Sequence, residues 1–140
     1  MVQKLHNDFV GEYYHISEWL KSIDNVKSQQ IPEHLLKKAR YLKNELLTSS
    51  TQQVFLHGDL HLDNVLQNDR DWLAIDPKGI LGEPAFDIAA FDFINPIEIE
   101  RKLNINDLFE MRINNIAQKT NLDAQRLKDW VFVRLILAAA

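Results

Sequence analysis

The chain has 140 residues and a net charge of −4, and 46% of its residues are hydrophobic, so it can form one domain with a buried core and carries no basic surface for nucleic acid. It contains no cysteine, which excludes disulfides and thiolate chemistry. No apolar run approaches the ~20 residues that cross a bilayer, and the first residues lack the apolar core of a signal peptide. We therefore expect a cytoplasmic protein with neither nucleic-acid nor membrane partners.

Helical spacing of apolar residues dominates the first fifty residues. Phe9, Tyr13, Ile16 and Leu20 predict a helix over 8–23. Pro32 opens a second helix, at a position where proline is well tolerated. The apolar stripe of this second helix is Leu35, Leu36, Ala39, Leu42, Leu46 and Leu47. The polar run over 48–51 then predicts a linker.

Short strands are expected in the middle of the chain and helices after it. The strands are Val54–Leu56, Val65–Gln67 and Trp72–Ile75. The helices run from Glu83 to about Phe93, from Asn106 or Asp107 to about Thr120, and from about Asp123 to the end. These elements predict a single α+β domain over 1–140 that is mainly helical. Its last residues, WVFVRLILAAA, form an apolar helix end without a cap, which favours a fragment.

The octapeptide HGDLHLDN, residues 57–64, concentrates polar groups between two apolar runs. It holds two histidines, two aspartates and an asparagine, which indicates a functional loop between buried strands. Asp59 precedes Asn64 by five positions, the spacing of a kinase catalytic loop. In such a loop the aspartate accepts the proton of the substrate hydroxyl, and the asparagine holds a metal.

The segment after this loop predicts a β-hairpin that would bring two oxygen ligands together. A three-residue connection over 69–71 pairs Val65 with Ile75, and it places Asn64 opposite Asp76 at the open end. Directly opposed residues have Cα atoms ~4.5–5.5 Å apart. An amide oxygen and a carboxylate at that separation suit Mg²⁺, which prefers a few oxygen ligands with phosphate and water.

Three motifs at linked spacing, HGDLHLDN, AIDPKG and GEPAFDIAAF, resemble the aminoglycoside phosphotransferase family. The closer resemblance is to its streptomycin 6-kinase or hydroxyurea-resistance kinase branch. The resemblance implies a protein-kinase-like C-terminal lobe, in which a small β-hairpin carries the catalytic and metal loops. It also implies ATP and Mg²⁺ as cofactors and a small-molecule hydroxyl as substrate. An aminoglycoside such as streptomycin is one candidate acceptor.

The resemblance also implies residue roles. Asp59 would be the catalytic base, and Asn64 and Asp76 would be the Mg²⁺ ligands. His57 would orient the catalytic loop, and Asp87 would match a buried aspartate that anchors this loop through its backbone. Two further residues, Lys78 and His61, are candidates for contact with the nucleotide phosphates.

The resemblance does not extend to the nucleotide-clamping lobe of a kinase. That lobe needs a glycine-rich loop and a strand lysine paired with a helix glutamate. The chain has four glycines, Gly11, Gly58, Gly79 and Gly82, and they form no glycine-rich loop. We therefore expect the N-terminal lobe of a parent protein to be missing and the chain alone to be inactive.

Two other functions stay open. His57, Asp59, His61 and Asp63 alternate like the ligands of a binuclear metal hydrolase, although no histidine follows His61. A non-catalytic remnant lobe is the other alternative, and the missing clamping lobe gives it weight.

Overall fold

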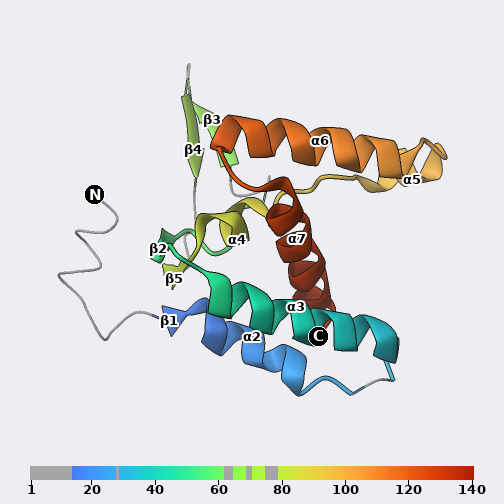
Figure 1. Ribbon diagram of the computed structural model, residues 1–140. Coiled ribbons are helices and arrows are strands. Elements are labelled where there is room, and N and C mark those ends of the chain that lie inside the picture. The colour runs from blue at the N-terminus through green and yellow to red at the C-terminus, as the bar shows by residue number, and fades with distance from the viewer. Residues whose placement is uncertain (1–13, 28, 62–64, 69–70, 75–78) are drawn as a thin grey trace.

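The computed structural model describes residues 14–27, 29–61, 65–68, 71–74 and 79–140. Over these ranges the chain is mostly helical, with a small three-stranded sheet and a separate β-hairpin, as expected for an α+β fold (Figure 1). The elements in chain order are β1 (Tyr14–His15), α2 (Ile16–Asp24), α3 (Glu33–Ser49), β2 (Val54–Leu56), β3 (Val65–Asn68), β4 (Asp71–Ala74), β5 (Ile80–Gly82), α4 (Pro84–Ile88), α5 (Pro96–Glu100), α6 (Ile105–Thr120) and α7 (Ala124–Ala139).

The three-stranded sheet joins segments that are far apart in the sequence. Its order is β1-β5-β2, with β1 parallel and β2 antiparallel to β5. In the register of β2 with β5, Val54 pairs with Gly82. A Cβ at Gly82 would lie 2.8 Å from two side-chain atoms of Ile16 at the start of α2. Glycine is therefore required for the close contact between this sheet and α2.

Helix α7 is the centre of the core. Figure 1 shows it between α6 and α3, and it packs against both of these helices as well as α4. Trp130 on α7 is fully buried, and its ring lies 5.3 Å from that of Phe86 at 90°. Phe86 also meets Trp19 edge to face, with ring centroids 5.9 Å apart. These three aromatic rings link α2, α4 and α7.

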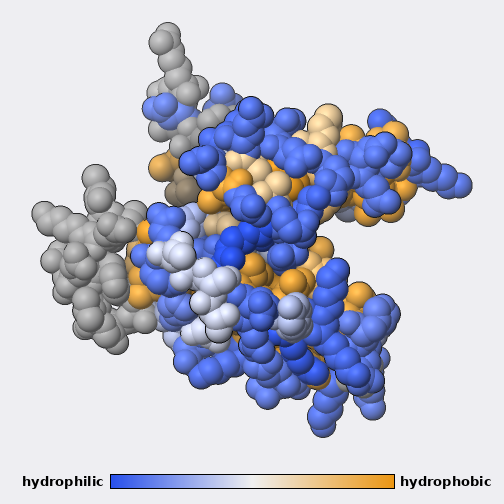
Figure 2. Space-filling model, in the orientation of Figure 1, coloured by the Kyte–Doolittle hydropathy of each residue, from blue (hydrophilic) through white to orange (hydrophobic). Residues whose placement is uncertain are grey.

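The outer surface is polar over most of the visible face. Figure 2 shows hydrophilic residues covering most of this face, with hydrophobic residues visible where α7 lies between α6 and α3. Within the described ranges, no helix combines the length and the apolar character needed to cross a bilayer.

Three helix predictions need correction. The helix predicted from Asn106 or Asp107 begins at Ile105, and its N-cap is Asn104, whose side chain accepts a hydrogen bond from the Asp107 N–H. The helix predicted over 8–23 begins only at Ile16, because Tyr14 and His15 form a strand and the His15 side chain caps the helix through Ser17 N–H. Residues 8–13 lie outside the described residues. The helix predicted from Glu83 to about Phe93 ends at Ile88.

Besides β1, two elements were not predicted from the sequence. Strand β5 was missed because Ile80–Gly82 is short and ends in glycine, and its partners β1 and β2 are distant in sequence. Helix α5 was missed because it has only five residues. It begins with a capping box, in which Asn95 and Glu98 satisfy each other's backbone N–H groups.

The predicted hairpin exists, but its predicted register is wrong by one residue. Val65 pairs with Ala74 instead of Ile75, and Asn68 pairs with Asp71. The connection therefore has two residues instead of three, the commonest hairpin length. The predicted pairing of Asn64 with Asp76 depended on the three-residue connection, and both residues lie outside the described ones.

Candidate active site

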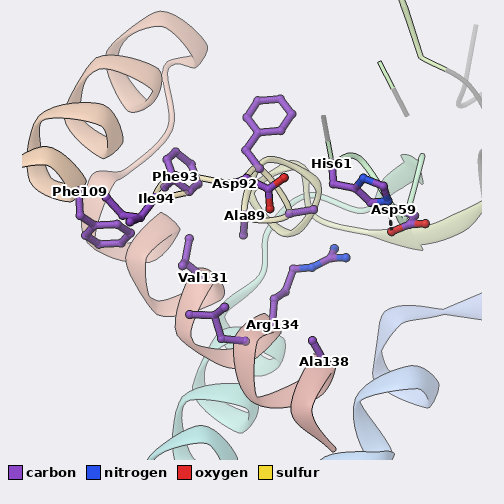
Figure 3. Close-up of a pocket in the computed structure, with 13 residues that line it drawn as sticks. Asp59, His61, Ala89, Asp92, Phe93, Ile94, Phe109, Val131, Arg134 and Ala138 are labelled. Atoms are coloured by element: carbon purple, nitrogen blue, oxygen red, sulfur yellow. Dashed lines mark ion pairs between the residues drawn. The ribbon is translucent and has the colours of Figure 1, made fainter. Parts of the chain in front are cut away.

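The polar loop begins where strand β2 ends at Leu56. Gly58 has a φ of +89°, a backbone conformation that side chains other than glycine rarely adopt. The chain therefore turns between the buried Leu56 and Asp59. This turn brings Asp59 and His61 to the edge of a pocket (Figure 3).

The carboxylate of Asp87 on α4 holds the backbone of this turn. One carboxylate oxygen, Oδ2, accepts a hydrogen bond from the His57 N–H at 2.8 Å, and the other, Oδ1, accepts one from the Gly58 N–H at 2.8 Å. Hydrogen bonds to an ionised acceptor are stronger than neutral ones. Asp87 therefore contacts the backbone of the loop. The residue is half-buried, whereas a buried aspartate was expected, and its role in supporting the site stays a prediction.

The His57 ring points back to the loop that it begins. Its Nδ1 accepts a hydrogen bond from the Asp59 N–H at 3.1 Å. A backbone N–H can only donate, so Nδ1 carries no proton in this arrangement. This contact joins the ring to the backbone of the loop, and the loop-orienting role of His57 stays a prediction.

Asp59 and His61 lie side by side at the pocket. Their side chains are 33% and 31% exposed, and His61 Nε2 lies 3.5 Å from Asp59 Oδ1. The two groups form an ion pair when the imidazole is protonated. Asp59 is therefore accessible to a molecule in the pocket while its backbone is fixed.

The pocket has a volume of about 470 Å³, the size of a small-molecule site. Its polar side chains are Asp59, His61, Asp92 and Arg134. Its apolar wall includes Phe93, Ile94, Phe109 and Val131. Figure 3 shows the Arg134 side chain extending from α7 toward Asp59 and His61. A polar molecule with an apolar face would fit this lining.

Sequence reasoning missed Arg134 and Asp92. Arg134 Nη2 donates to the Gly58 carbonyl at 3.1 Å, and Nη1 donates to the Phe86 carbonyl at 2.9 Å. Burial lowers the pKa of the Arg134 guanidinium from its ordinary value, and the negative charges of Asp87 and Asp59 oppose this shift. The signal in the sequence was a lone charge in an apolar helix, which needs a partner. Asp92 gave no comparable signal.

Of the residues predicted to contact metal or phosphate, His61 lies at the pocket, and the other three lie outside the described residues. Asn64, Asp76 and Lys78 lie outside the described residues, as does Asp63 of the alternating cluster. Strand β3 starts directly after Asn64, and β4 ends two positions before Asp76. Among the side chains that the structure describes, no three of His, Cys, Asp or Glu are grouped so as to hold a metal ion.

Comparisons with known proteins identify relatives over nearly the whole chain. The family model described as aminoglycoside/hydroxyurea antibiotic resistance kinase matches residues 2–140. The streptomycin 3''-kinase of Klebsiella pneumoniae is 35% identical over 129 residues, which cover 89% of this chain and 47% of that kinase. The streptomycin 6-kinase of Streptomyces griseus is 34% identical over 82 residues, which cover 58% of the chain and 27% of the kinase.

A shorter match reaches the hydroxyurea phosphotransferase of Kitasatospora aureofaciens, which is 56% identical over 34 residues, 24% of this chain and 10% of that protein. The chain spans less than half the length of each of these relatives. No solved structure matches the chain. Because the family model extends over almost every residue, the chain belongs to the aminoglycoside/hydroxyurea antibiotic resistance kinase family.

Proposed function

We propose that the chain is the catalytic and acceptor-binding part of an ATP-dependent phosphotransferase that acts on a hydroxyl of a small molecule. The observation that carries the proposal is Asp59, which faces a pocket of about 470 Å³ while its loop is anchored by Asp87. Family membership and the streptomycin kinases among the relatives support the same reaction. An aminoglycoside such as streptomycin is the first acceptor to test.

In the proposed reaction Asp59 acts as the general base. The acceptor hydroxyl lies in the pocket with its proton directed at the Asp59 carboxylate, and its oxygen attacks the γ-phosphorus of the nucleotide. A bond forms from this oxygen to phosphorus, the bond to the ADP oxygen breaks, and the proton passes to Asp59. The fixed backbone of the loop reduces the entropy lost in reaching this geometry.

Asn64 and Asp76 would hold Mg²⁺, because their amide and carboxylate oxygens are the donors that this ion prefers. The bound ion would neutralise charge on the nucleotide phosphates. Lys78 and His61 would contact the same phosphates. The position of the His61 ring, beside Asp59 at the pocket, supports its assignment.

We further propose that the chain corresponds to the larger lobe of a protein-kinase-like enzyme. Its mainly helical fold and the 47% coverage of the Klebsiella pneumoniae kinase support this interpretation. The sequence contains no glycine-rich loop to close over the phosphates. Residues 1–140 alone should therefore bind ATP weakly and turn over poorly, and robust phosphotransfer by them would contradict this part of the proposal.

The test is a phosphotransfer screen of the longest reading frame that encodes these residues. ATP and GTP would be offered with streptomycin and with a panel of sugar alcohols. We expect Asp59→Ala to lower kcat by about 10²–10⁴-fold with little change in nucleotide affinity. Glu45→Ala, which removes an exposed carboxylate from α3, serves as the control and should leave kcat unchanged. Wild-type kcat in the Asp59 variant would refute the proposed base.

The metal assignment has a separate test. Asn64→Ala and Asp76→Ala should each raise the Mg²⁺ concentration needed for half-maximal activity. Wild-type Mg²⁺ dependence in both variants would show the assignment to be wrong. Hydrolysis that depends on Zn²⁺ or Mn²⁺, without transfer to any acceptor, would instead favour the metal-dependent hydrolase.

A further inference from the structure

The peptide group that joins Gly58 to Asp59 is held at both of its polar ends. Its N–H donates to His57 Nδ1 at 3.1 Å, and its carbonyl accepts from Arg134 Nη2 at 3.1 Å. The two preceding N–H groups, those of His57 and Gly58, both donate to Asp87. The backbone leading into Asp59 is therefore fixed by three different side chains.

Arg134 is itself rigidly supported. Its Nη1 donates to the Phe86 carbonyl at 2.9 Å, and its Cζ lies 4.1 Å from the centroid of the Phe86 ring and 5.6 Å from that of Trp19. Such stacking of a guanidinium on aromatic rings is favourable and restricts its orientation. Phe86 directly precedes Asp87, so α4 carries both the carboxylate that holds the loop and the carbonyl that holds Arg134.

The charges around the loop favour this arrangement. Arg134 is the cation whose interactions with the carboxylates of Asp87 and Asp59 offset part of the unfavourable burial of its own charge. It lines the pocket together with Asp59. Loss of its side chain would remove a hydrogen-bond donor from the loop and a positive charge that interacts favourably with both carboxylates.

From this geometry we infer that Arg134 is a positioning residue for Asp59: it holds the Gly58 carbonyl and so fixes the place of the Asp59 carboxylate in the pocket. This inference rests on the proposed function of Asp59 as base. The C-terminal helix α7 thereby takes part in catalysis through the loop. Its other residues at the pocket, such as Val131, contribute apolar wall.

The test compares Arg134→Met with a matched arginine variant. Arg40→Met is the control. Like Arg134, Arg40 donates to backbone carbonyls, those of Ile23 at 3.2 Å and Val26 at 3.0 Å. Arg40 does not line the pocket. In the longest reading frame, both variants should lower Tm. At a temperature where both remain folded, we expect kcat to fall by about 10- to 100-fold for Arg134→Met alone.

The KM for the Mg-nucleotide should stay within about twofold in both variants, because Arg134 holds the base and not the nucleotide. Arg134→Lys, which keeps the charge and one donor, should recover part of kcat. A kcat for Arg134→Met within twofold of that for Arg40→Met would overturn the inference.

Amide hydrogen exchange measured by NMR on the chain gives a readout that does not require activity. Exchange at His57, Gly58 and Asp59 should accelerate in Arg134→Met and stay at the wild-type rate in Arg40→Met. A loss of kcat without faster exchange would overturn the positioning role, because Arg134 would then act on the acceptor directly. If the wild-type protein phosphorylates no acceptor although the loop amides exchange slowly, the proposed function is refuted. The role of Arg134 in catalysis is then refuted as well.

Discussion

Replacing Asp87 by asparagine tests how the candidate catalytic loop is anchored. Asp87 offers one oxygen to each of two backbone N–H groups, at 2.8 Å each. The amide of asparagine is neutral and keeps one acceptor oxygen, and its NH₂ group faces the second N–H. One hydrogen bond is therefore lost, and the other is no longer charge-assisted. A charge-assisted hydrogen bond is worth about 1.5–3 kcal/mol, and we expect the lower part of that range because Asp87 is half-buried.

The expected loss for Asp87→Asn is therefore about 1.5–2 kcal/mol in the free energy of unfolding, or about 3–8 °C in Tm for a domain of this size. Asp87→Ala removes both acceptors and should cost about 3–4 kcal/mol. Urea unfolding followed by circular dichroism measures both variants. Asp92→Asn, an exposed carboxylate at the same pocket, is the control and should stay within about 0.5 kcal/mol of wild type.

An anchoring role of Asp87 would be refuted if the free energy of unfolding of Asp87→Asn lay within about 0.5 kcal/mol of wild type, the range of ordinary surface substitutions. It would also be refuted if amide exchange at His57 and Gly58 kept its wild-type rate in Asp87→Ala. In the longest reading frame, both Asp87 variants should lower kcat more than they raise KM, because the loop carries the proposed base.

Three further predictions concern stability. Gly82→Ala should cost about 1–3 kcal/mol by overpacking, since its Cβ would lie within 3.0 Å of buried side chains; unchanged urea unfolding would contradict this. Arg126→Met should lower the free energy of unfolding by about 3–5 kcal/mol, because it leaves Glu83, which is 7% exposed, without its charged partner. In a thermal double-mutant cycle, the variant that also carries Glu83→Gln should lose less stability than the sum of the two single variants. Hydrogen bonding to Arg112 lowers the pKa of Glu98 to about 2, so the contribution of this pair is present above pH ~4.5 and is lost as pH falls toward 2. Acid titration of wild type and Glu98→Gln checks this: the stability difference between them should shrink over that window, and a difference independent of pH would be inconsistent with the pair.

The sequence determined the elements whose signals are local. The stripe from Leu36 to Leu46 placed α3 correctly, and the predicted start of the last helix near Asp123 agrees with α7, because the apolar spacing of a helix depends on neighbouring residues. The spacing of HGDLHLDN and its two companion motifs identified the family, because functional groups in a loop keep their order along the chain.

Tertiary structure decided what depends on distant partners. Strand β5 exists because β1 and β2 pair with it, and these pairings join residues that are far apart in sequence. The hairpin register followed the favoured two-residue connection, which the spacing of apolar residues did not reveal. Arg134 reaches Gly58 only because α7 packs against α4. A sequence pattern states which groups are present, whereas packing in three dimensions decides which of them meet.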